Sequence, residues 1–79
     1  MTNLEKYTQA FVESFGSNEE KVKELRYQDI EAWDSVGHMT LIAALEESFD
    51  IMMDTDDIID FNSYEKGMEL LSQKYDVVF

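Results

Sequence analysis

Three side chains that could take part in chemistry lie close together in one stretch of the chain: Asp34, Ser35 and His38. A serine with a histidine three residues away suggests a nucleophile and its general base. On a helix, however, His38 points toward the apolar side and away from Val36, and nothing nearby supplies an oxyanion hole or an orienting acid. The stretch therefore does not predict an enzyme, and its remaining chemical feature is the hydroxyl of Ser35.

The residues that follow Ser35 predict a helix that begins beside it. Asp34 and Ser35 are both favoured N-cap residues. Apolar residues then recur at helical spacing, at Leu41, Ile42, Leu45 and Phe49. A serine at a helix start is most often a cap, so a purely structural role for Ser35 stays open. The other interpretation is an exposed hydroxyl, next to an acid, that another enzyme modifies.

This stretch resembles the modification site and second helix of acyl carrier proteins. The resemblance rests on the Asp34-Ser35 pair, the apolar Val36, the pair Leu41-Ile42, and the run from Ala44 to Phe49. It extends from Leu4 to Tyr75 and needs no gap between Trp33 and Tyr64. In that family the serine carries a 4′-phosphopantetheine arm, derived from coenzyme A, that holds acyl or aminoacyl groups as thioesters.

The resemblance implies roles for two residues and for several partners. Ser35 would be the attachment point of the arm, and Asp34 would assist the Mg²⁺-dependent phosphopantetheinyl transferase. The arm would supply the thiol that this chain, which has no cysteine, lacks. Further partners would be a ligase that loads the acyl or aminoacyl group, and an acyltransferase or synthase with a basic docking patch.

The chain departs from the common fatty-acid carrier pattern around Ser35. Trp33 precedes the Asp-Ser pair, Val36 and Gly37 follow it, and Thr40 stands where an acid is frequent. Together with His38, these residues resemble discrete carriers dedicated to a specialised pathway. The substitutions leave the implied role of Ser35 intact and argue against housekeeping fatty-acid synthesis.

Two faces of the helix after Ser35 have different expected roles. At 100° per residue, the apolar residues lie on one side, and small or acidic residues lie on the other. The apolar side contributes His38, Leu41, Ile42 and Leu45 as candidates for a pocket that shields the carried group. Phe61 and Met68, from the two later helices, are the other candidates. The opposite side, extended by later acids, is the expected partner surface: Val36, Thr40, Ala43, Glu46, Glu47, Asp54, Asp56 and Asp57.

The remaining periodicity predicts an all-α single domain over residues 1–79, namely a four-helix bundle of acyl-carrier type with a long first loop and a short third helix. Helices are expected at about 3–15, 35–50, 55–61 and 63–75.

Capping boxes are expected to begin at Ser17 and Asn62, while Thr55 and the two acids after it should cap the third helix. Core anchors in the first loop are Val22, Leu25, Ile30 and Trp33. Gly67 is expected to serve close packing, and the tail from Asp76 to be loose unless Phe79 folds back.

Charge is distributed unevenly along the chain, whose net charge is −12. No lysine or arginine occurs between Tyr27 and Glu65, a segment that contains eleven acids. Such a field disfavours nucleic acid, favours encounter with basic protein patches, and should keep the chain monomeric. The N-terminal residues lack the basic flank and apolar run of a signal peptide, and no apolar stretch approaches the roughly 20 residues of a membrane span, so a cytoplasmic location is expected.

Two alternatives compete with a carrier. Acids from Asp54 onward partly match a calcium loop, but Ile58 and Ile59 occupy positions that need a ligand and a glycine turn, so no metal site is expected. A small acidic adaptor that binds basic proteins remains open. In such an adaptor Ser35 would only cap its helix, and no prosthetic group would be attached.

Overall fold

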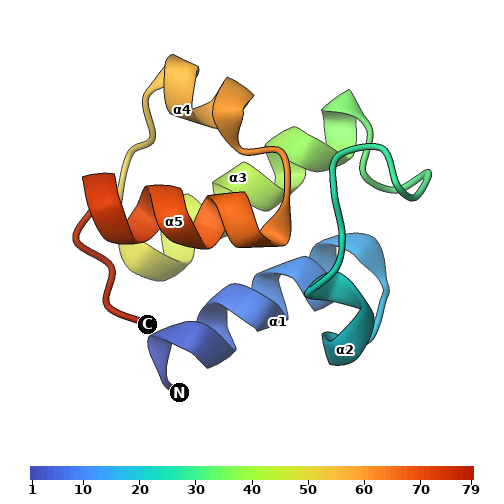
Figure 1. The fold of residues 1–79 in the computed structure, drawn as a ribbon, viewed down its shortest axis with the longest axis horizontal. Helices are drawn as coiled ribbons and strands as arrows, with labels where there is room; N and C mark the ends of the chain where they lie inside the picture. The colour runs from blue at the N-terminus through green and yellow to red at the C-terminus, as the bar shows by residue number, and fades with distance from the viewer.

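The computed structural model describes residues 1–79 and consists of five helices without β-strands (Figure 1). In chain order they are α1 (Asn3–Phe15), α2 (Glu19–Val22), α3 (Ser35–Phe49), α4 (Thr55–Asp60) and α5 (Tyr64–Lys74). The expectation of an all-α chain is confirmed. Four helices lie within one residue of the ranges expected, and the fifth, α2, is one short turn inside the long first loop. None of the helices combines the length and the apolar character required to cross a membrane.

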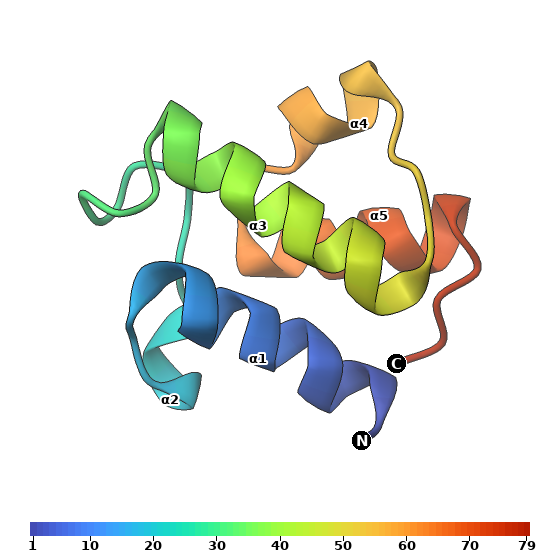
Figure 2. The ribbon, with the colours of Figure 1, turned by 180° about the vertical axis from the view of Figure 1, so that it is seen from behind.

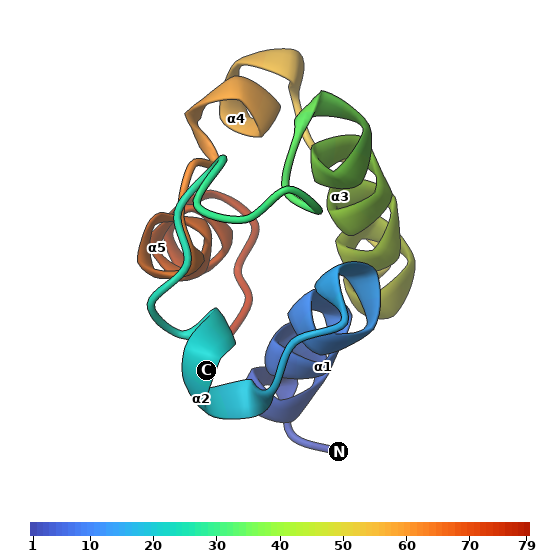
Figure 3. The ribbon, with the colours of Figure 1, turned by 90° about the vertical axis from the view of Figure 1, so that its right-hand side faces the viewer.

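Helices α1 and α3 pack against each other and form one side of the molecule (Figure 2). Viewed from the side, α5 lies opposite this pair, and the short helices α4 and α2 lie at the two ends (Figure 3). The side chains between them form one core, in which Tyr7, Phe11 and Trp33 have no exposed surface. Trp33 is therefore a core residue, as its size and position in the loop predicted.

Helix ends follow the expected chemistry with small shifts in position. Thr2 and Glu5 form a capping box at the start of α1, and Gly16 ends that helix in the left-handed conformation at φ 63°. The two expected capping boxes are wrong by one residue. Asn18 rather than Ser17 caps α2, and Ser63 rather than Asn62 caps α5, because these side chains reach the free amides of the first turn.

The third expected cap is also wrong, because α4 has no side-chain cap. Asp54 occupies the N-cap position without accepting a hydrogen bond, and Thr55 is the first helical residue. Asp57 turns inward, toward α5, and is only 3% exposed. Helix α4 is consequently held by contacts with its neighbours rather than by its own end.

Gly67 is required by packing in the middle of α5. A Cβ atom at this position would overlap the ring of Phe61 and the hydroxyl of Tyr7. That hydroxyl donates a 2.6 Å hydrogen bond to the carbonyl of Tyr64, so it has little freedom to move. The prediction of close packing at Gly67 is confirmed.

The chain between α2 and α3 is attached to the connection between α4 and α5. Arg26 and Ser63 form an isolated antiparallel bridge, the amide of Tyr64 donates to the carbonyl of Leu25 at 3.0 Å, and the amide of Tyr27 donates to the carbonyl of Asn62 at 2.8 Å. Periodicity does not predict such a short bridge between irregular segments. The bridge and its two neighbouring hydrogen bonds fix the loop between α2 and α3, which was expected to be held only by apolar side chains.

The C-terminal residues pack onto the domain, so the expectation of a loose tail is wrong. Val77 is buried, and the ring of Phe79 lies 5.2 Å from that of Tyr7 and 6.2 Å from that of Phe49. The side chain of Asn3 donates to the carbonyl of Val78 at 3.0 Å, which joins the two ends of the chain. Phe79 thus folds back and covers the end of the core.

Candidate functional site

Ser35 lies at the first position of α3 with an exposed side chain whose hydroxyl makes no hydrogen bond within the protein. The cap is Asp34, whose Oδ1 accepts a 2.8 Å hydrogen bond from the amide of Gly37. The capping role left open for Ser35 is therefore wrong, since Asp34 fills it. What remains at the start of α3 is an accessible hydroxyl directly beside a carboxylate.

Gly37 allows the chain to approach α3 closely. A Cβ atom at this position would collide with the carbonyl group of Ala32, so only glycine fits between that carbonyl and the first turn of α3. In the sequence, Gly37 stands out only as a departure from a family pattern. A signal for such a contact was available in the sequence. Glycine in the first turn of a helix lowers helix stability by about 1 kcal/mol relative to alanine, so its presence suggests a packing reason.

Trp33 and His38 hold the two sides of the Asp34-Ser35 pair together. The indole Nε1 of Trp33 donates to Nδ1 of His38 at 3.0 Å, and Nε2 of His38 donates to the carbonyl of Ile58 at 2.7 Å. Both bonds are satisfied by the neutral imidazole that carries its proton on Nε2. The side chain is half-buried against the rings of Trp33, Tyr27 and Phe61. His38 is thereby fully engaged in joining the loop, α3 and α4.

The residues expected to line an apolar pocket form the core itself. Leu41, Ile42, Leu45 and Phe61 have no exposed surface, while Met68 is half-buried and packs against the core. Two surface pockets, one beside Arg26 and one beside Lys74, are lined by other residues. The apolar pocket candidates are thus brought together, in a closed arrangement.

The expected partner surface is assembled along one side of α3. Val36, Thr40, Ala43 and Glu47 are exposed, and Val36 retains 73% of its surface. Met39, which the sequence analysis did not include, is 52% exposed on the same side. Its position one turn before Ala43 was the signal available for it. This set of residues, Val36, Met39, Thr40, Ala43 and Glu47, is called the α3 outer face below.

Glu46 differs from the other acids of the expected partner surface. It is half-buried, and its Oε2 accepts a 2.9 Å hydrogen bond from the amide of Met53. The carboxylate therefore holds the loop between α3 and α4 against α3. Glu46 contributes charge near the α3 outer face, but it also has a structural role that the sequence analysis missed.

Asp57 is a correction to the expected partner surface, because its carboxylate is buried. Oδ1 accepts a 2.7 Å hydrogen bond from Nζ of Lys74, and Oδ2 accepts one of 2.6 Å from the hydroxyl of Tyr75. These bonds, that from Lys74 first, lower the pKa of Asp57. The hydrogen bond to Asp57 raises the pKa of Lys74, and burial together with the same carboxylate raises the pKa of Tyr75. Asp54 and Asp56 remain exposed nearby.

Comparison of the chain with protein-family models, with curated proteins and with solved structures finds no match. No group of three or more histidine or acidic side chains is arranged to hold a metal ion. The residues around Ser35 and their geometry are therefore the observations that bear on function.

Proposed function

We propose that the protein is a discrete acyl or aminoacyl carrier, modified with 4′-phosphopantetheine on Ser35. The observation that supports this proposal is the free, exposed hydroxyl of Ser35 at a helix start that Asp34 already caps. A serine that is needed for neither capping nor packing is available for modification. Asp34 offers its exposed carboxylate beside it, where a transferase and its Mg²⁺ can use it.

The modification balances as a phosphoryl transfer. The Oγ of Ser35 attacks the phosphorus of coenzyme A that bears the pantetheine, and an O–P bond forms. The bond between that phosphorus and the bridging pyrophosphate oxygen breaks, and 3′,5′-ADP leaves. The proton of the Ser35 hydroxyl passes to a base of the transferase. The product carries a terminal thiol, which an activating ligase can acylate to a thioester.

The order of the helices supports this role. In a four-helix bundle of acyl-carrier type, α1, α3, α4 and α5 would be the four helices, and α2 would be a turn in the first loop. A carrier must present its attachment point at a fixed place for several enzymes. The hydrogen bonds from Trp33 through His38 to Ile58 fix the approach to Ser35. The close contact between Ala32 and Gly37 adds to this restraint.

Partner enzymes would dock on the α3 outer face. Exposed apolar side chains, Val36 and Met39, lie there beside the acid Glu47. A small apolar patch flanked by charge suits a transient interface better than a permanent one. The partners would present basic patches to this face and to Asp54 and Asp56, and electrostatic attraction would accelerate encounter.

The α3 outer face also favours a second candidate, a small acidic adaptor that binds basic proteins without a prosthetic group. The adaptor would use the same apolar and acidic residues. It would have no use for the free hydroxyl of Ser35, and substitution of that residue would leave its binding intact.

The deciding experiment is an intact-mass spectrum after incubation with coenzyme A, Mg²⁺ and a broad-specificity phosphopantetheinyl transferase. The parent protein should gain one phosphopantetheine group, and Ser35→Ala should gain none. Ser48→Ala, an exposed serine on the same helix, is the matched control and should be modified like the parent. A folded parent that gains no mass from an active transferase would leave the adaptor as the better interpretation.

A further inference from the structure

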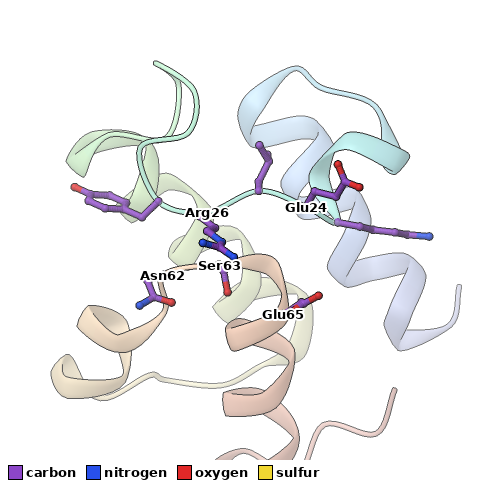
Figure 4. A pocket seen from close by; sticks show the side chains of 8 residues that line it. Glu24, Arg26, Asn62, Ser63 and Glu65 are labelled. Carbon is purple, nitrogen blue, oxygen red and sulfur yellow. The ribbon is translucent and has the colours of Figure 1, made fainter.

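A surface pocket lies away from the apolar core, between the loop after α2 and the start of α5 (Figure 4). It has a volume of about 720 Å³ and is lined mainly by polar side chains, among them Arg26, Asn62 and Ser63. The bridge between Arg26 and Ser63 and the hydrogen bond from Tyr27 to Asn62 fix its backbone. The pocket is thus preformed and does not depend on a bound ligand for its shape.

The polar groups in this pocket have unused hydrogen-bonding capacity. Arg26 forms no ion pair, and its guanidinium makes no hydrogen bond within the protein, although the chain has an excess of acids. The side-chain amide of Asn62 is also without a protein partner. Ser63 accepts from the amide of Lys66 through Oγ, which leaves its hydroxyl proton free to be donated. Figure 4 shows the guanidinium of Arg26 lying over Ser63, with Asn62 on one side.

These three donors match a carboxylate. A guanidinium binds the two oxygens of a carboxylate through a planar pair of hydrogen bonds, and neutral donors complete the set. Glu24 and Glu65 also line the pocket and offset the positive charges of Arg26 and Lys23, which reduces its attraction for anions in general. A singly charged, planar group that accepts hydrogen bonds from these donors is therefore favoured over a phosphate with two charges.

Tyr27 links the pocket to the helix that begins at Ser35. The ring of Tyr27 lines the pocket and lies 5.4 Å from the ring of His38. His38 is three residues, or nearly one helical turn, after Ser35. A phosphopantetheine arm joins a phosphate, a pantoyl unit, β-alanine and cysteamine end to end, so it is long compared with one helical turn. Its end can reach a pocket beside Tyr27.

We infer that this pocket receives the free carboxylate of a short, polar acyl group carried on Ser35, with Arg26 as the main binding residue. The inference rests on the proposed carrier function and names its class of cargo. The closed apolar core supports it, because Leu41, Ile42 and Leu45 leave no opening for a long hydrocarbon chain in this structure. A carboxylate-bearing acyl group instead finds free donors at a preformed polar site.

The test uses NMR spectra of the protein loaded with two isosteric arms, succinyl-phosphopantetheine and its neutral amide, succinamyl-phosphopantetheine. The succinyl arm should shift the amide signals of Arg26, Asn62 and Ser63, and the succinamyl arm should not. Arg26→Gln should abolish the difference. Lys21→Gln removes the same charge from an exposed position outside the pocket and should preserve it. Equal spectra for the two arms, or a difference that survives in Arg26→Gln, would overturn the inference.

A titration of the unmodified protein with free succinamate, which carries one carboxylate like the tethered succinyl group, separates this inference from the carrier function. Succinamate should shift the same three amides and neutral succinamide should not, and Arg26→Gln should weaken succinamate binding about tenfold, as expected for loss of a charged hydrogen-bond partner. If the transferase fails to load the chain but free succinamate binds, the carboxylate site stands and its tethered source is refuted. If neither arm nor free succinamate affects these amides, the site is refuted even where loading succeeds.

Discussion

The indole nitrogen of Trp33 donates to Nδ1 of His38 at 3.0 Å, so the ring directly before the Asp34-Ser35 pair is bound to the helix directly after it. The other nitrogen of the same imidazole binds the carbonyl of Ile58 in α4. His38 is therefore a positioning residue that joins three segments. It has no free nitrogen with which to act as a base toward Ser35.

His38→Ala should destabilise the domain, because it leaves the buried indole N–H and the carbonyl of Ile58 without partners. One or two unpaired groups cost about 1–3 kcal/mol of the free energy of unfolding. His38→Gln should lose less, because its amide offers both a donor and an acceptor. Urea unfolding at neutral pH measures both variants.

The fluorescence of Trp33, the only tryptophan, reports the same change locally. Its emission in folded His38→Ala should shift toward that of a solvated indole, and that of His38→Gln should stay near the parent. An alanine variant with parental stability and emission would show that the two hydrogen bonds do not position the loop.

Asp34→Ala and Ser35→Ala should affect stability differently, although the two residues are neighbours. Loss of the cap bond from Asp34 to the amide of Gly37 should cost about 1 kcal/mol. Ser35 makes no hydrogen bond and is exposed, so its substitution should stay within about 0.5 kcal/mol of the parent. Thermal unfolding measures both, and a larger loss for Ser35→Ala would mean that the serine hydroxyl has a structural partner after all.

Gly67→Ala should have two opposite effects on stability, a gain from helix propensity and a loss from overpacking. Alanine in a helix interior is better than glycine by about 1 kcal/mol. Overpacking costs about 1–3 kcal/mol and more where the neighbours cannot move, and here the neighbours are the buried ring of Phe61 and the hydrogen-bonded hydroxyl of Tyr7. The net effect should be destabilisation, measured by urea unfolding against exposed Ser72→Ala in the same helix. A more stable Gly67→Ala would contradict the packing argument.

Elements with clear periodicity were predictable from the sequence, whereas contacts between irregular segments were not. The ranges of α1 and α3 follow from apolar spacing and from Gly16 and Asp34 at their ends. The bridge between Arg26 and Ser63 joins segments without a pattern, so no local signal marks it. Its consequence, the polar pocket, was equally invisible.

The candidate site shows the same division. The stretch with Ser35 was recognisable, but the decision between Asp34 and Ser35 as the cap depends on one hydrogen bond to Gly37. Asp57 was wrongly assigned to the partner surface, because an acid in the first turn of a short helix usually stays exposed and interacts favourably with the helix dipole. Its burial depends on Lys74 and Tyr75, which come from a different helix.

Asp57→Asn should lower stability at neutral pH and have little effect in acid. A carboxylate whose pKa is lowered in the folded state contributes stability above its ordinary pKa of about 4. That contribution is lost as the pH falls through the lowered folded-state pKa, so the two proteins should converge there. Urea midpoints between neutral and acidic pH measure the difference, with exposed Asp56→Asn as the matched control. A constant difference at all pH values would mean that the ion pair with Lys74 does not contribute.

Glu46→Lys and Glu47→Lys test the docking surface, and the structure separates them. Glu46 accepts from the amide of Met53, so its reversal should cost about 1 kcal/mol of stability. Glu47 is exposed, and its reversal should change stability by no more than about 0.5 kcal/mol. Glu47→Lys is therefore the variant in which an effect on partners is not confused with unfolding.

If basic partners dock on the α3 outer face, Glu47→Lys should slow modification by the transferase several-fold at low salt. The difference in modification rate between Glu47→Lys and the parent should become smaller as salt is raised toward 1 M, where the screening length falls to about 3 Å. Glu13→Lys makes the same charge change at an exposed position on α1 and should be modified at nearly the parental rate. Equal slowing by both reversals would mean that only net charge matters, and it would remove the α3 outer face as the docking site.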